Sequence, residues 1–246
     1  MRTLWSAAAR RRFSATSIAR AFPSAGLALL LSLFSAGPLA RTLLAADSYS
    51  LEKITEAPPA ELPAALRDAV RGEALEVKGP SGVLCEIWLR KEVPVAAAPS
   101  TELGITFGQI AEGTFLGVMR IAAPTTDYRN QKIKPGVYTL RYADTPVDGN
   151  HQGVAPQRDF ALLSPAAEDA DPASITRDEA IKRSTKTTGS KHPSVWSLWP
   201  GDDSATAPAL RYQSDSEIWL LTFRLPLSGG TQLSVGMVVA GHAPEA

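Results

Sequence analysis

Short alternations of apolar and polar residues recur along most of the chain, and they predict antiparallel β structure. In Gly136–Ala143, the bulky residues Tyr138, Leu140 and Tyr142 are separated by single residues of mixed character. This period of two is typical of a strand with one buried face. A Lys-Pro-Gly turn is expected just before it, because proline fixes φ and glycine tolerates a positive φ. Two similar runs complete the centre of the predicted domain, Thr114–Ala122 and Asp159–Ser164.

Further strands are predicted before and after this centre. A hairpin is expected where Ala74–Val77 and Val83–Lys91 flank a loop of Lys, Gly, Pro and Ser. Shorter strands are predicted at Leu103–Gln109 and Val195–Leu198, and the last two, joined through a Gly-Gly pair, at Glu217–Pro226 and Gln232–Ala240. Short strands at regular spacing favour a mainly β fold, and we expect an antiparallel β-sandwich of about eight or nine strands.

Two short helices are predicted beside the strands. Glu61–Arg71 carries apolar residues at helical spacing, and Gly72 is well placed to end that helix. Thr176 and Glu179 form the capping-box pattern, in which the hydroxyl and the carboxylate satisfy reciprocal backbone N–H groups. A helix to about Lys186 is expected to follow.

Residues 1–46 have the pattern of an export signal peptide, which leaves residues 47–246 as a single β-sandwich domain. Arg10-Arg11-Arg12-Phe13 supplies positive charge, and Ala25–Phe34 is an apolar run too short to span a bilayer comfortably. Cleavage is expected near Ala45 or Ala46. The Arg-Arg-x-Phe sequence also resembles a twin-arginine signal, and an uncleaved anchor is the alternative. We expect a secreted bacterial protein, periplasmic or extracellular, that meets the membrane only through the signal during export.

Charge and cysteine content narrow the function classes. The whole chain has 25 basic and 25 acidic residues, but residues 1–46 hold six arginines and no acid. The remaining 19 basic residues face 25 acidic ones, a balance of about −6 that argues against a nucleic-acid partner. The one cysteine, Cys85, excludes an intrachain disulfide and lies in an alternating run, where a buried, inert thiol is expected.

Linear motifs for phosphate binding, serine hydrolysis or zinc proteolysis do not occur in the sequence, which favours a protein that is not an enzyme. The strongest polar cluster is the segment between two predicted strands, residues 144–159, because functional loops are often carried by a rigid scaffold. Its oxygen-bearing side chains could hold calcium, although Asp-Gly-Asn at 148–150 is also an ordinary turn sequence. The candidate ligand-loop residues are Asp144, Asp148, Asn150 and Asp159.

The three histidines are the candidate ligands for a transition metal. His151, His192 and His242 all lie in predicted loops or at a strand end, so they could converge at one end of the domain. Three imidazoles suit a tetrahedral zinc or copper site with one open position. The alternative is three unrelated surface histidines. A blue-copper site is disfavoured, because Cys85 lies early in the chain on a strand.

Several sequence segments resemble those of a known group of proteins. They are Glu86–Lys91, Lys134–Tyr142, Asp148–His151, Arg158–Phe160, the surroundings of His192-Pro193, and Val238–His242. In these phrases the chain resembles a group of uncharacterised bacterial exported proteins. The Pro-Gly-x-Tyr-Thr-Leu phrase is also similar to exported β-sandwich domains of unknown function and to prealbumin-like modules. The resemblance implies an exported β-sandwich and brings neither an activity nor catalytic residues.

These observations lead to one main functional hypothesis and two alternatives. We expect a non-catalytic envelope module that binds a protein or small ligand, with an exposed aromatic or apolar patch that includes Trp196 and Trp199. The first alternative is a metal-binding protein or metalloenzyme that uses the three histidines, with a transition metal or calcium as its cofactor. The second is a purely structural envelope protein, which would show neither feature.

Overall fold

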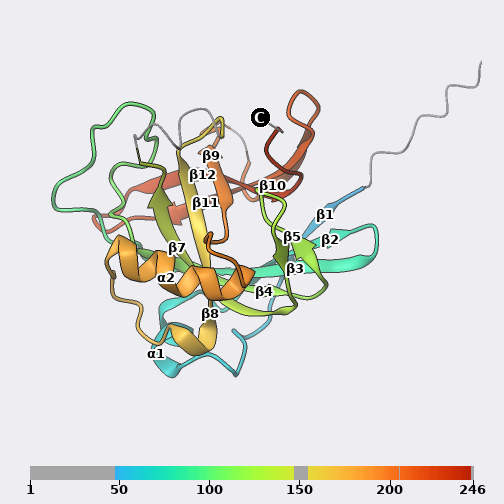
Figure 1. Ribbon diagram of the computed structural model, residues 1–246, viewed down its shortest axis with the longest axis horizontal. Coiled ribbons are helices and arrows are strands. Elements are labelled where there is room, and N and C mark those ends of the chain that lie inside the picture. The colour runs from blue at the N-terminus through green and yellow to red at the C-terminus, as the bar shows by residue number, and fades with distance from the viewer. Residues whose placement is uncertain (1–47, 147–154, 205, 245–246) are drawn as a thin grey trace, which may run out of the picture. The chain divides into compact units, whose positions relative to one another are not determined.

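Ten strands form one antiparallel sheet in the computed structural model, which describes residues 48–146, 155–204 and 206–244 (Figure 1). The strands lie in the order β1-β2-β3-β4-β7-β8-β9-β12-β11-β10. The first five in this order are β1 (Ser50–Ile54), β2 (Ala74–Gly79), β3 (Gly82–Leu89), β4 (Phe115–Ile121) and β7 (Gly136–Asp144). The other five are β8 (Asp159–Pro165), β9 (Trp196–Pro200), β12 (Gln232–Ala240), β11 (Ile218–Pro226) and β10 (Ala209–Gln213).

The smaller elements lie in the connections. A separate two-stranded ribbon joins β5 (Thr125–Thr126) to β6 (Lys132–Ile133). The helices are α1 (Ala64–Ala69), a 3-10 turn η1 (Ala166–Glu168) and α2 (Arg177–Thr188). Within the described ranges, none of them is long and apolar enough to cross a membrane.

The main sheet curls until its two edges meet, so that it is nearly closed like a barrel. Strands β1 and β10 are in contact, although no pairing between them occurs in the described residues. Beside them the rings of Tyr49 and Trp219 lie 5.3 Å apart. Strand β9 pairs with β8 on one side and with β12 on the other. It therefore joins the main-sheet strands from β1 to β8 and the strands β10 to β12 into one sheet, whereas a sandwich would keep them as two. The mainly β, antiparallel class with two α-helices is confirmed, whereas the sandwich of eight or nine strands is not.

One face of the sheet supplies the main core. Tyr138, Leu140 and Tyr142 of β7 point into it, as the alternation predicts. Cys85 of β3 is fully buried in the same cluster, and burial raises the pKa of its thiol to about 12. A thiol held in its neutral form is a poor nucleophile, so the expectation of an inert core cysteine is confirmed.

Both helices cover the opposite face of the sheet (Figure 1). Helix α1 buries Leu66 in a cluster with Trp88, Phe115 and Val118. Helix α2 packs Ala180 against Ala143, Phe160 and Leu162 at the ends of β7 and β8. Strand β7 is therefore buried on both faces, and the prediction of a half-buried strand there is wrong.

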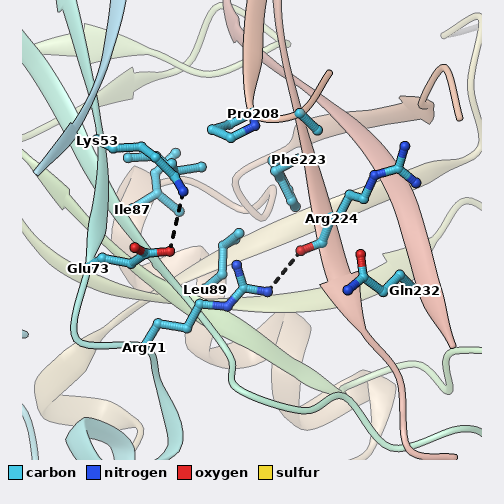
Figure 2. Close-up of a pocket in the computed structure, with 11 residues that line it drawn as sticks. Lys53, Arg71, Glu73, Ile87, Leu89, Pro208, Phe223, Arg224 and Gln232 are labelled. Carbon is cyan, nitrogen blue, oxygen red and sulfur yellow. Dashed lines mark hydrogen bonds and ion pairs between the residues drawn. The ribbon is translucent and has the colours of Figure 1, made fainter. Parts of the chain in front are cut away.

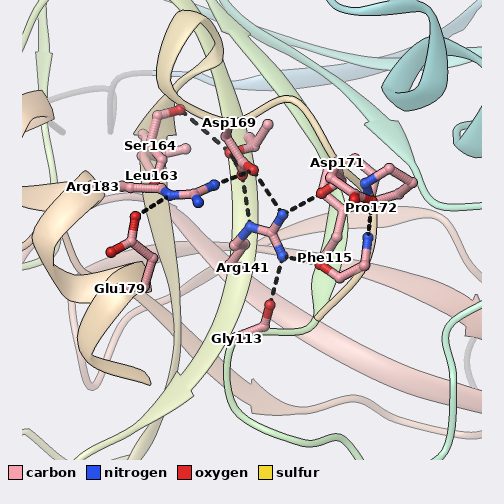
Figure 3. Close-up of polar contacts among 12 residues, drawn as sticks. Gly113, Phe115, Arg141, Leu163, Ser164, Asp169, Asp171, Pro172, Glu179 and Arg183 are labelled. Atoms are coloured by element: carbon pink, nitrogen blue, oxygen red, sulfur yellow. Dashed lines mark hydrogen bonds and ion pairs between the residues drawn. The ribbon is translucent and has the colours of Figure 1, made fainter. Parts of the chain in front are cut away.

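A fully buried ion pair ties the outer face of β7 to the segment that covers it (Figure 3). Arg141 and Asp169 are both 0% exposed. The guanidinium donates from Nε and Nη2 to the two carboxylate oxygens at 2.6 and 2.8 Å. Its other three N–H groups donate at 2.6–2.8 Å to the carbonyl oxygens of Gly113, Asp171 and Ala173. All five donors are satisfied, which is what a buried arginine requires.

The same carboxylate joins α2 to this network. Asp169 also accepts hydrogen bonds from the Thr139 hydroxyl at 2.6 Å and from Arg183 at 2.8 Å. Arg183 lies on α2 and bonds Glu179 as well, as Figure 3 shows. One carboxylate thus fixes β7, the chain after η1 and α2 relative to one another.

Several local predictions need correction. Leu103–Gln109 is not a strand, because Asp159 takes the backbone N–H groups of Thr106 and Phe107 that a strand would use for pairing. Helix α1 ends at Ala69, and Val70 is already extended, so the helix stops short of Gly72. Only half of the capping box forms: Thr176 accepts from the Glu179 N–H, but the Glu179 carboxylate pairs with Arg183.

Candidate functional site

The predicted ligand loop starts and ends at the paired ends of β7 and β8. Asp144 and Asp159 are direct cross-strand partners, so their side chains share one face of the sheet. Asp148, Asn150 and His151 lie outside the described residues. The two carboxylates that the structure does describe have very different surroundings.

Asp159 is buried and fully engaged by the protein. Its oxygens accept hydrogen bonds from the backbone N–H of Thr106 at 2.8 Å, from that of Phe107 at 3.0 Å and from the Tyr142 hydroxyl at 2.7 Å. Burial, together with the Asp159 charge, raises the pKa of Tyr142 far above its usual range. Because Phe107 belongs to the main core, Asp159 holds the preceding loop against the end of the sheet.

Asp144 faces an acidic pocket of about 760 Å³, whose lining includes Glu102, Glu112, Pro146 and Arg177. Arg177 bonds Glu112 at 2.8 Å and lies 4.0 Å from Asp144. Arg158 lies 3.6 Å from Asp144 on its other side. Burial, reinforced by the Glu112 charge, raises the pKa of Asp144 from 3.8 to about 6 despite the two arginines.

This pKa predicts a pH-dependent stability. Well below pH 3.8 Asp144 is protonated in both states, whereas above about pH 6 the folded protein must hold it ionised at a cost of roughly 3 kcal/mol. Asp144→Asn should therefore gain stability relative to the natural protein as pH rises from 4 to 6. Urea unfolding at pH 4 and pH 7.5 measures this, with Asp203→Asn, at an exposed carboxylate, as the control for one lost charge. A variant that instead loses stability toward pH 7.5 would show that Arg158 and Arg177 outweigh burial.

A second, more enclosed cavity lies on the other side of Arg177. This apolar pocket holds about 330 Å³ and shares Pro146 and Arg177 with the acidic pocket. Its apolar walls come from four segments far apart in the sequence, at Tyr128, Phe160, Ile181 and Val195. Arg129, Arg177 and His192 also line it, and none of its described lining residues is acidic.

A buried carboxylate shapes one wall of the apolar pocket. Asp127 accepts hydrogen bonds from the backbone N–H groups of Arg129, Gln131 and Val195 at 2.8–3.0 Å. Burial nevertheless raises the pKa of Asp127, so these bonds only partly offset its desolvation. The tight turn that results presents Tyr128 to the pocket and brings Val195, just before β9, alongside it. Tyr128 is itself fixed by backbone bonds to Val195 and Ala243.

The two described histidines lie in different pockets. His192 lines the apolar pocket, whereas His242 lines a different one together with Ser214–Glu217. In the part of the chain that the structure describes, no three His, Cys, Asp or Glu side chains are grouped so that they could hold a metal ion. Since His151 lies outside that part, the three-histidine site stays a prediction.

The tryptophans do not form the expected surface patch. Trp196 is buried in the main core, so an exposed patch that includes it is wrong. Trp199 is half-buried against a small cluster around Tyr128 and Leu220. Among the described residues, the large apolar side chains that are exposed are Val95, Leu103 and Tyr212.

Sequence reasoning found Asp144 and His192 but missed the apolar pocket between them. Its wall residues are ordinary apolar positions in a turn, a strand, a helix and a loop, and no linear spacing relates them. The only available signal was Arg177, the first residue after the N-cap of a helix marked by its capping-box pattern. Comparison with protein-family models, curated proteins and solved structures finds no match to this chain.

Proposed function

We propose that this protein is an exported, non-catalytic binding module that holds a small ligand in the apolar pocket. The ligand has an apolar body and an anionic group. A single observation carries this proposal: apolar walls and basic residues converge on one cavity with no acid among its described lining. A cavity of about 330 Å³ lies within the range of small-molecule sites, which are mostly apolar with a few polar groups.

The walls and the basic residues have separable roles. Tyr128 and Phe160 are nearly buried and offer aromatic surface to the body of the ligand. Arg177 is already paired with Glu112, whereas the Arg129 side chain forms no hydrogen bond or ion pair with any other described residue. Arg129 is therefore the group that we assign to the anionic end, because a guanidinium binds carboxylate and sulfonate oxygens through several N–H groups.

Two fluorescent probes with the same body test this assignment. 1-Anilinonaphthalene-8-sulfonate carries an anionic group, and N-phenyl-1-naphthylamine has the same rings without it. We expect the natural protein to prefer the sulfonate. Arg129→Gln should weaken sulfonate binding about tenfold, the loss of one charge-assisted contact of about 1.4 kcal/mol, and leave the neutral probe unchanged. Ile181→Trp should abolish both by filling the cavity.

Leu103→Ser is the matched control, because Leu103 is an exposed apolar residue outside this pocket that could bind such dyes unspecifically. Probe binding that survives Ile181→Trp but is lost in Leu103→Ser would contradict the proposal. The export component rests on the charge and apolar pattern of residues 1–46. It is read out by the mass of the protein recovered from the periplasm, which should lack that segment.

A further inference from the structure

Another cavity lies at the seam where the sheet fails to close (Figure 2). This seam pocket holds about 170 Å³. Ile87 and Leu89 of β3 line it from one side, and Phe223 and Arg224 of β11 from the other. Lys53 of β1 and Pro208, just before β10, stand at its edge, so both edge strands contribute to it.

The floor of the seam pocket is the main core itself. Leu75, Ile87, Leu89 and Phe223 all belong to the core cluster and are 5% exposed or less. The inner-face side chains leave room at this point of the nearly closed sheet. A cavity of about 150 Å³ lined by such residues accepts benzene, so 170 Å³ has space for one six-membered ring with a small substituent.

The rim of the seam pocket carries an excess of positive charge. Lys53 lies 3.7 Å from Glu73, and both side chains are about half exposed. Arg224 lies 3.5 Å from Asp203. Arg71 donates one hydrogen bond at 3.0 Å to the Arg224 carbonyl oxygen but forms no ion pair with any described residue. Figure 2 shows its guanidinium directed into the cavity beside Leu89.

An arginine without a carboxylate partner above an apolar floor fits one class of ligand. Its remaining N–H groups can bind two oxygens of one anion side by side, while the apolar part of the ligand fills the space below. We propose that the seam pocket is a second binding site, which takes a small aromatic or short-chain carboxylate with its anionic group on Arg71. This site is separate from the apolar pocket, with which it shares no lining residue.

Fluorine NMR on the full mature chain tests the proposal with 4-fluorobenzoate and the neutral 4-fluorobenzamide. We expect the benzoate signal to broaden and shift on binding, and the amide to bind at least fivefold more weakly. Arg71→Gln should weaken benzoate binding at least fivefold, and Arg71→Lys should restore part of it. Gln232→Trp, at an exposed position on the rim, should block the mouth and reduce binding of both probes.

Two controls separate this site from general charge effects and from the apolar pocket. Lys91→Gln removes an exposed positive charge near the end of β3 and should leave benzoate binding unchanged. Because a benzoate also fits the ligand class proposed for the apolar pocket, the titrations are repeated in the Ile181→Trp background, where that pocket is filled, and the expected differences should persist there. Circular dichroism confirms folding of each variant. In the Ile181→Trp background, absence of benzoate binding, equal binding of the two probes, or full binding by the folded Arg71→Gln variant would overturn the proposal.

Discussion

Replacement of Arg141 by methionine should lower the free energy of unfolding by roughly 3–5 kcal/mol. The change removes five hydrogen bonds from a fully buried site. Among the described residues, Asp169 then keeps Arg183 alone as a charged partner, and three carbonyl oxygens lose a donor that water cannot easily replace. Urea denaturation at neutral pH measures the loss.

Lys186→Met provides the control for this prediction. Lys186 forms an ion pair with Glu168 at 2.6 Å on the same covering segment, but both side chains are more than 40% exposed. Such exposed pairs contribute about 0–1 kcal/mol, so this variant should remain close to the natural protein. If Arg141→Met loses no more than Lys186→Met, the buried network does not stabilise the fold as we describe.

Replacement of Asp159 by alanine should lower stability by roughly 3 kcal/mol, because two backbone N–H groups and one hydroxyl lose a shared acceptor. The effect should be local as well as global. The loop that ends at Phe107 is held to the sheet by these bonds, so amide hydrogen exchange at Thr106 and Phe107 should accelerate.

A double-mutant cycle makes this second prediction specific. Tyr142→Phe alone removes one bond to Asp159, but in the Asp159→Ala background it should have little further effect, because the shared acceptor is already gone. Asp159→Asn keeps one oxygen as an acceptor and should lie between the natural protein and Asp159→Ala. Unchanged exchange at Thr106 and Phe107 in Asp159→Ala would refute the anchoring role.

The strands that sequence could locate are those in which packing dictates every second residue. β3, β7, β11 and β12 place long apolar side chains in the core at regular intervals, and their alternation is visible without a structure. β1 and β10 were not predicted, because an edge strand near the seam buries few of its side chains. In β1, Ser50–Ile54, no residue is fully buried. Their strand geometry comes from pairing with β2 and β11 rather than from their own composition.

The candidate sites were harder to predict than the strands. Their geometry depends on which segments cover a face of the sheet and on which distant segments meet around a cavity. The alternation along β7 correctly separated Arg141 from Leu140, but it could not show that residues after η1 fold over that outer face. In the same way, Asp144 was identified as a polar loop residue, whereas the neighbouring cavity requires four distant segments to meet. The alternation along a strand therefore predicts on which face of the sheet a side chain lies. Tertiary packing decides whether that face is exposed to solvent.

The order of the strands also sets the order in which the chain can fold as it is synthesised. Up to β8 each strand of the main sheet pairs with the previous one made, so this part can assemble as it emerges from the ribosome. The last four strands differ, because β12 lies between β9 and β11. Until residues 232–240 have been made, β9 has no neighbour on that side and the hairpin of β10 and β11 cannot join the sheet. The second half of the sheet is therefore completed by its last strand, and a nascent chain that stops before it leaves β9 and β11 each without the neighbour that they share.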